Sequence, residues 1–310
     1  MPAALSPHHF RAELALAGVT IIWGTTFVLV KAALEDVSPI LFLAIRFALA
    51  SFVLLILYRA SHSSHSLFAH PEAPFAGLLA GLFLGVAYLF QTVGLQFTSP
   101  SKSAFITSLC VVLVPLLSLI VYRNVPGPVE IFAVCMAMFG MWLLTAPATG
   151  AGWNAGDLLT LAAASAFAAH VLVLGRYAPL VGFGPISILQ VCAAAAGFAA
   201  TFFWLESPRI RLSTAVLSAI LITALLCTAL AFTVQAWAQQ HTSASRTALI
   251  FALEPISAAA TSYLLHGEIL SRRAAAGAAM ILAAVVWVEL RPQTRPETFP
   301  PASASIKSGT

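Results

Sequence analysis

Two charged residues lie deep inside apolar stretches of this sequence, and both have side chains suited to binding or proton transfer. Glu254 is about eight residues, or roughly 12 Å, into its apolar segment. A charge at the centre of a spanning helix costs about 2.5–3.5 kcal/mol on insertion scales, so such residues usually face protein or a water-filled cavity. Glu254 is therefore a candidate to bind an ammonium group or to take up a coupling proton. Arg46 is a candidate to hold a carboxylate through two parallel hydrogen bonds.

Structural roles for these two residues stay open as alternatives. A protonated Glu254 would hydrogen-bond a carbonyl group freed by Pro255, because proline interrupts the helical hydrogen-bond ladder. Arg46 would bond carbonyl groups at a helix end, or it would pair with Glu254. In the paired case, removing one partner would strand the other and cost about 3–5 kcal/mol, so the double mutant would be milder than either single mutant.

Aromatic and uncharged polar residues outline a cavity suited to an amphipathic solute. Tyr88 and Gln91 are three residues apart and share a helix face. Aromatic rings offer stacking area, while amide and imidazole groups place a few hydrogen bonds. The alternative is hydrogen bonding between packed helices, worth about 0.6 kcal/mol on average. The candidate substrate-binding residues are Trp23, Thr26, Arg46, Tyr88, Gln91, His170, Gln190, Gln235 and Glu254.

Two further cations, Lys102 and Arg246, stand near the beginnings of apolar segments. Each closely follows serine residues, which are preferred helix N-caps. These cations are candidates either for anchors at the membrane interface or for parts of a gate. The candidate caps are Ser99 or Ser101 for the first segment, and Ser243 or Ser245 for the second.

The composition identifies the class of protein that contains these residues. The chain has 310 residues, of which 60% are hydrophobic and 8% charged, against about 25% charged in soluble domains. It is therefore expected to be an all-α integral membrane protein. Its basic residues are scattered singly, so the formal charge of +4 does not favour a nucleic-acid partner. The four cysteines form no ligand spacing, and neither a metal site nor a cofactor is predicted.

Apolar runs of spanning length divide the chain into ten expected helices. The N-terminus lacks the pattern of a cleaved signal peptide, so the first run is expected to remain as a helix. We expect a cytoplasmic N-terminal segment at 1–13 and a disordered C-terminal tail at 291–310. The expected helices are 14–34, 39–58, 75–97, 102–122 and 129–146 in the first half, and 157–175, 183–204, 214–239, 246–265 and 274–290 in the second.

The second half of the chain repeats the first at a shift of 144 residues. The segment QFTSPSKSAFITSL, 96–109, aligns with QHTSASRTALIFAL, 240–253, and seven of the fourteen positions are identical. The same shift pairs Gln91 with Gln235, whereas it pairs Glu254 with Cys110. The two repeats are expected to span 14–146 and 157–290. The segment around 240–246 is thus expected to be architecture shared by both halves, and Glu254 an unshared functional group.

Five helices per repeat is an odd number, so the second repeat must enter the membrane from the opposite side. Inverted repeats are typical of secondary transporters, which bind substrate near the midplane between the repeats. Ten helices also place both termini on one side. The basic residues favour a cytoplasmic side for the termini only weakly.

Several segments make the chain resemble the EamA-like branch of the drug/metabolite transporter superfamily. They are WGTTFVLVKAAL (23–34), SPILFLAIRFALA (38–50), TSPSKSAFITSLCVVLVPLLSLI (98–120) and SRTALIFALEPISAAATSYLLHGEIL (245–270). The resemblance covers about residues 14–290. It implies ten helices in two inverted five-helix repeats and cytoplasmic termini. It also implies transport, often export, of amino acids, related metabolites or drugs.

The expected function is secondary transport of a small amphipathic metabolite by alternating access, in a bacterial inner membrane. Glu254 is the candidate for a coupling proton. The alternatives are a channel or facilitator, or an intramembrane scaffold or receptor. An enzyme is not expected, because the sequence contains no GxSxG or HExxH motif. The substrate, the direction of transport and the oligomeric state are left open.

Overall fold

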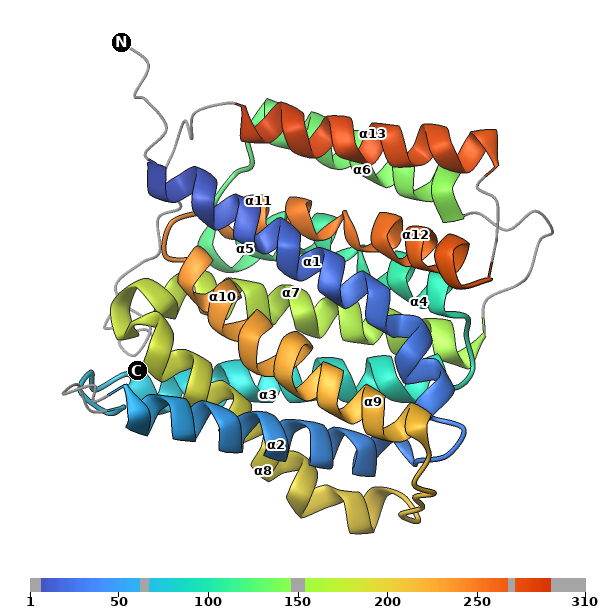
Figure 1. Cartoon of the computed structure of the whole chain (residues 1–310). Helices are drawn as coiled ribbons and strands as arrows, with labels where there is room; N and C mark the ends of the chain where they lie inside the picture. Colours follow the sequence, from blue (N-terminus) through green and yellow to red (C-terminus); the bar gives the residue numbers. More distant parts are fainter. Residues whose placement is uncertain (1–6, 62–66, 146–153, 267–270, 291–310) are drawn as a thin grey trace.

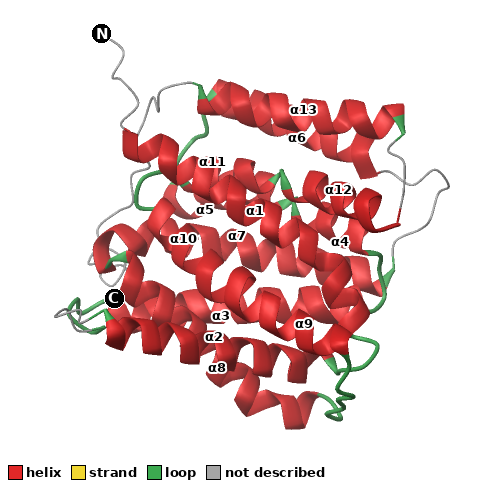
Figure 2. Ribbon diagram, in the orientation of Figure 1, coloured by secondary structure: helices red, strands yellow, loops and turns green. Residues whose placement is uncertain are grey.

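The computed structural model describes residues 7–61, 67–145, 154–266 and 271–290. The regular secondary structure of these residues is helical apart from one isolated bridge between Val37 and Ile210, and Figure 2 shows the helices joined by short loops. The first helix begins at Pro7, earlier than the expected boundary at residue 14. The predicted tail at 291–310 lies outside the described residues.

The helices of the two halves follow the same order along the chain. In the first half they are α1 (Pro7–Ala33), α2 (Pro39–Ala60), α3 (Ala73–Leu95), α4 (Pro100–Thr107), α5 (Cys110–Tyr122) and α6 (Pro128–Thr145). In the second half they are α7 (Ala155–Val181), α8 (Phe183–Leu205), α9 (Thr214–Ile222), the π-helix η1 (Thr223–Leu230), α10 (Ala231–Ala238), α11 (Ala244–Phe251), α12 (Glu254–His266) and α13 (Arg272–Glu289).

Two segments predicted as single helices, 102–122 and 246–265, are each broken into two pieces. The breaks fall at Ser108–Leu109 and Ala252–Leu253, which are 144 residues apart. At both breaks the backbone tightens: Leu109 N–H donates to the Ile106 carbonyl at 3.1 Å, three residues back rather than four. Pro255 explains the second break, because its backbone nitrogen has no hydrogen to donate to a helical hydrogen bond. No proline stands at the first break, so both halves share this geometry without sharing the proline.

Serine residues begin the first piece of each broken helix. The Ser99 hydroxyl accepts a hydrogen bond from Lys102 N–H, and the Ser243 hydroxyl accepts one from Arg246 N–H, both at 3.3 Å. The predicted N-caps are confirmed at these two of the four candidate serines.

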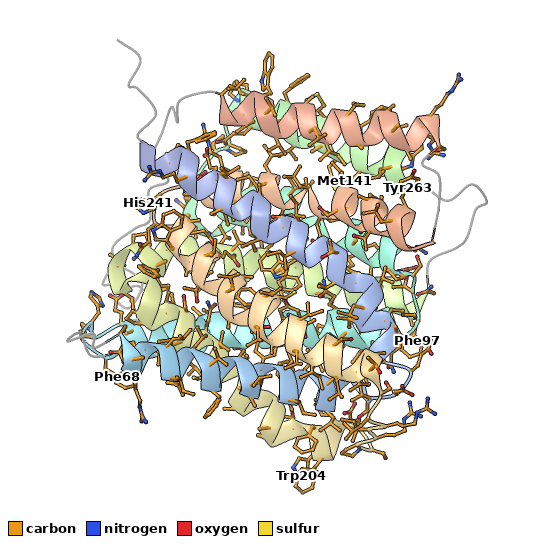
Figure 3. The ribbon with its side chains drawn as sticks, viewed as in Figure 1. Phe68, Phe97, Met141, Trp204, His241 and Tyr263 are labelled. Carbon is orange, nitrogen blue, oxygen red and sulfur yellow. The ribbon has the colours of Figure 1, made fainter. Side chains whose placement is uncertain are left out.

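Seven helical segments within the described residues are long and apolar enough to cross a membrane. They include α4–α5 and α9–α10 taken as continuous segments; the apolar stretch Pro128–Leu144 of α6 is shorter. Side chains on the outer faces of these segments are exposed and apolar, among them Phe52, Leu78 and Phe203. Figure 3 shows Trp204, 87% exposed, at the end of α8 and pointing away from the helices. An exposed apolar surface of this extent is typical of an integral membrane protein.

The helices pack so that equivalent pairs recur between the halves. α3 packs on α7, and the counterpart of α3, α9–α10, packs on α1. In the same way α1 packs on α12 and α5 on α7. Figure 1 shows α2 and α8 at one edge of the molecule, and α6 beside α13 at the other. It also shows α1 running from left to right, whereas its counterpart α7 runs from right to left.

Candidate functional site

A cavity of about 60 Å³ lies at the centre of the bundle, between the two halves. Helices from both halves contribute to its wall. Eight of the nine candidate substrate-binding residues line it, and Gln190 does not. The lining residues are Trp23, Thr26, Phe27, Val30, Arg46, Tyr88, Gln91, Thr92, Leu95, Thr107, Cys110, Phe167, His170, Val171, Phe232, Gln235, Phe251 and Glu254.

Most of this lining consists of residue pairs related by the 144-residue repeat. A position in one half therefore faces the same cavity as its counterpart in the other. The lining pairs are Trp23/Phe167, Thr26/His170, Phe27/Val171, Tyr88/Phe232, Gln91/Gln235, Thr107/Phe251 and Cys110/Glu254.

Four aromatic rings form a connected wall of the cavity. The ring centroids of Tyr88 and Phe232, which are repeat counterparts, lie 6.0 Å apart in an edge-to-face arrangement. Each ring also contacts an aromatic residue of the other half: Trp23 lies 5.5 Å from Phe232, and Phe167 lies 5.3 Å from Tyr88. Trp23 Nε1 donates to the Cys227 carbonyl at 2.9 Å, so its indole is held in position. The wall offers an apolar stacking surface.

Arg46 reaches the cavity from α2 and is buried, with 3% of its surface exposed. Its Nε donates to Thr228 Oγ1 at 2.8 Å, and its guanidinium carbon lies 4.3 Å from the centre of the Tyr88 ring. The π-helix η1 positions Thr228, whose hydroxyl donates to the Thr223 carbonyl five residues back. Among the described residues Arg46 forms no ion pair with Glu254, so the pairing considered from sequence is absent here.

Glu254 is the first residue of α12, directly after the second helix break, and is 7% exposed. Within the described residues, its carboxyl group makes no hydrogen bond or ion pair to protein. A buried carboxyl group without such partners is available to a ligand or a proton. The backbone around it is tightly packed: a Cβ atom added to Gly24 of α1 would lie 2.5 Å from the Glu254 carbonyl oxygen. Gly24 therefore allows α1 to approach the broken helix.

The two repeat-related amides are bonded differently. Gln91 Nε2 donates to Thr107 Oγ1 at 3.0 Å, beside the first helix break. Gln235 Nε2 donates to Gln239 Oε1 at 3.0 Å, while Gln235 Oε1 is buried and has no partner among the described residues. Gln235 Oε1 is therefore available to accept a hydrogen bond from a ligand in the cavity. Such a bond would be favourable, because a buried acceptor without a partner destabilises the protein.

His170 and Gln190 form a pair of their own. A ring nitrogen of His170, Nε2, lies 2.7 Å from Gln190 Oε1. Gln190 is fully buried and does not line the cavity, so the structure places it behind His170 as a supporting residue. Thr26, the counterpart of His170, donates to the Trp23 carbonyl within its own helix at 2.9 Å.

Lys102 and Arg246 do not line the cavity but lie at the beginnings of α4 and α11. Each pairs with an acid that was not among the predicted site residues: Lys102 with Asp157, and Arg246 with Glu13. The sequence does contain a pattern that could have identified these acids, because Glu13 and Asp157 are both acidic and are 144 residues apart, the spacing of the repeat. Both lie near helix ends, where charged residues are common and do not by themselves indicate a functional site.

The groups around the cavity are of the kinds that bind a small amphipathic ligand. One unpaired carboxyl group, one guanidinium group, amides and an aromatic wall surround the cavity. Within the part of the chain that the structure describes, no group of three or more His, Cys, Asp or Glu residues is placed to hold a metal ion.

Comparison with known proteins agrees with this description. The sequence profile of the EamA-like transporter family matches twice, at residues 10–146 and 154–290, and these segments are again offset by 144 residues. A protein of Archaeoglobus fulgidus, described as an uncharacterized transporter, is 33% identical over 280 residues, covering 90% of this chain and 86% of its own. A solved crystal structure that is 19% identical superposes with a TM-score of 0.74, over 90% of this chain and 96% of its own; it supports the fold alone.

Proposed function

Because the chain belongs to the EamA-like transporter family, we propose that it is a secondary transporter that moves a small amphipathic metabolite by alternating access. The observation that carries this proposal is the central cavity between the two halves. Seven repeat-related pairs line it, so both halves contribute to one site. A site on the axis between repeats can be exposed to either side by rocking one repeat against the other.

We propose ten membrane spans in two inverted five-helix repeats. Taken with their breaks, α4–α5 and α11–α12 count as one span each, and α9–α10 as another. The opposite directions of α1 and α7 support inversion, as do the equivalent contacts between the halves. α1 begins and α13 ends at the same end of the molecule in Figure 1, which supports termini on one side. We assign that side to the cytoplasm.

The proposed substrate carries both an amino and a carboxylate group, as amino acids do. Glu254 is suited to a ligand ammonium group, and Arg46 to a carboxylate. The Tyr88–Phe232 wall would contact the apolar part of the ligand. Gln235 Oε1 offers a further acceptor for an ammonium donor.

The size of the cavity supports a mechanism with moving halves. At about 60 Å³ it is far smaller than the roughly 300 Å³ lower bound of typical small-molecule pockets. We therefore propose that the repeats separate further to admit an amino acid. A cavity this small favours a carrier whose halves move over a permanently open channel.

We further propose export across the plasma membrane, coupled to a proton that Glu254 takes up in exchange for the substrate ammonium. Among the described residues the Glu254 carboxyl group has no protein partner, and this supports the role, because one group can then bind either a proton or a cation. The bilayer and the small-molecule substrate are the partners that this function requires.

Ligand-dependent stabilisation of the purified protein tests the proposal. A ligand that binds the native state raises the unfolding temperature with its concentration. Amino acids, amines, carboxylates and sugars should be compared, and flux of each stabilising compound measured in proteoliposomes. We expect amino acids to stabilise more than the amine or carboxylate alone. Equal stabilisation by a neutral sugar, or none by any amino acid, would contradict the proposed substrate class.

A further inference from the structure

A polar cluster lies at the end of the cavity where α3 meets α4. Lys102 Nζ donates to Asp157 Oδ2 at 2.6 Å, and Thr98 Oγ1 donates to Asp157 Oδ1 at 2.7 Å. The Asp157 side chain is fully buried, while the Lys102 side chain is 28% exposed. Lys102 belongs to the first half and Asp157 to the second, so this ion pair joins the two halves.

A second cluster lies where α10 meets α11. Arg246 Nη1 donates to Glu13 Oε1 at 3.2 Å, and Thr242 Oγ1 donates to the same oxygen at 3.3 Å. His9 Nε2 lies 3.1 Å from this oxygen, which adds a contact from the preceding turn of α1. The side chains of Arg246 and Glu13 are 4% and 5% exposed. This pair also joins the halves, because Glu13 belongs to the first and Arg246 to the second.

The two clusters are equivalent under the 144-residue repeat. Each consists of a threonine, a cation near the start of a broken helix and an acid near the start of α1 or α7. Equivalent side chains in inverted halves must lie at opposite ends of the molecule. Figure 1 agrees, because α4 begins at its right and α11 at its left. The equivalent residues are Glu13/Asp157, Thr98/Thr242 and Lys102/Arg246.

We propose that the ion pairs Lys102–Asp157 and Arg246–Glu13 are the two closures of the transport path, and that they break in alternation. The inference rests on the proposed function in taking the central cavity as the transported ligand's site. Both ion pairs are formed in this structure. Rocking one repeat against the other separates the partners at one end, where water can then solvate both charges, while the opposite pair holds.

The clusters are not identical, and they differ in the neighbouring basic side chain. At the Lys102 end, Lys31 Nζ donates to the Leu95 carbonyl at 2.6 Å and to the Gln96 carbonyl at 2.9 Å. It thereby holds the end of α1 against the end of α3. Its repeat counterpart is Gly175, which has no side chain to do so. At the other end His9 adds to the cluster instead.

Cys110 provides a reporter for the closures, because it lines the cavity and is 3% exposed. The other three cysteines, at positions 135, 192 and 227, would be replaced by alanine. A membrane-impermeant cationic methanethiosulfonate reagent would then be applied from one side at a time, to oriented cells and to inverted vesicles. The rate of Cys110 modification from each side is the readout.

Neutralising one acid should open one end only. Asp157→Asn should raise the Cys110 modification rate several-fold from the side of the Lys102 cluster and leave the opposite side unchanged. Glu13→Gln should do the reverse. Asp36→Asn is the matched control, because Asp36 pairs with the 81% exposed Arg211 in the connections preceding α2 and α9, outside both clusters. It should change neither rate.

A charge-exchanged variant guards against simple misfolding. Lys102→Asp combined with Asp157→Lys restores the ion pair and should return the modification rate towards the parent value. Unchanged rates in both single variants would overturn the proposal, and so would increased rates from both sides. Labelling needs no substrate, so its result is separate from that of the flux assay. Saturable transport with unchanged labelling would reject the closures alone, whereas one-sided labelling without transport would reject the proposed function alone.

Discussion

Glu254 and Cys110 occupy equivalent places in the two halves: each begins the second piece of a broken helix, and both line the central cavity. They are 144 residues apart, yet one is a carboxylic acid and the other a thiol. The backbone geometry is therefore symmetric while the chemistry is one-sided. In the proposed carrier, a single ionisable carboxyl group in the central cavity can serve both orientations.

We predict that Glu254→Gln uncouples transport from the proton gradient. Glutamine keeps the size and polarity of the side chain but can neither take up a proton nor balance a cation. A proton gradient directed against substrate movement should accelerate flux in the parent protein and have no effect in the variant. Flux into proteoliposomes with imposed pH differences measures this.

Glu35→Gln is the matched control for that experiment, because Glu35 is exposed in the turn after α1. It should keep the response to the gradient. A Glu254→Gln protein whose flux responds to the gradient like the parent would reject Glu254 as the proton site.

We predict that Arg46→Lys weakens binding of the carboxylate-bearing substrate by roughly 5- to 30-fold, or about 1–2 kcal/mol. Lysine keeps the charge but loses the planar fork that donates to Thr228 and lies over the Tyr88 ring. Ligand titration of unfolding temperature gives the affinity. Arg59→Lys, near the exposed end of α2, should leave affinity unchanged, and an equal loss there would contradict a specific role for Arg46.

We predict that Gln235→Leu weakens binding of the amino group of the ligand by about 1–2 kcal/mol, because the unpartnered Oε1 acceptor is lost. Binding of a carboxylate analogue without the amino group should change less. Isothermal titration with both ligands separates the two effects. Equal losses for both ligands would mean that the substitution acts through packing.

We predict that Gly24→Ala lowers the free energy of unfolding by about 1–3 kcal/mol, as overpacked substitutions do. The added Cβ would lie 2.6 Å from Ser257 Cβ and 2.5 Å from the Glu254 carbonyl oxygen, so α1 must move away from α12. Gly18→Ala is the control on the same helix, since its Cβ meets no atom within 4 Å. It should change stability by no more than about 1 kcal/mol. Equal effects at both positions in denaturant unfolding would argue against close packing at Gly24.

Much of the architecture was predictable, because the repeat is detectable in the sequence as matching residues at a shift of 144. The caps at Ser99 and Ser243 follow from short-range rules. A buried charge or amide in a spanning helix needs a polar environment, and this predicted that Arg46, Gln91 and Glu254 face a cavity.

Other features depend on tertiary contacts that no local pattern specifies. The break at Ser108–Leu109 has no proline from which it could be predicted. Gln190 has the same chemistry as the cavity amides, but packing places it behind His170. The acids Glu13 and Asp157 stand near helix ends, where a charge is ordinarily solvated. Only the folded chain shows that both are buried against a cation of the other half.

Counterflow in proteoliposomes tests the central claim most directly. Vesicles are loaded with an unlabelled amino acid identified by its stabilisation of the protein, and a trace of the labelled compound is added outside. A carrier with one site exposed alternately to each side predicts transient accumulation of label inside, saturable with external substrate and absent from vesicles without the protein. Uptake that is unsaturable and unaffected by internal substrate, across the whole set of amino acids and related metabolites, would contradict alternating access.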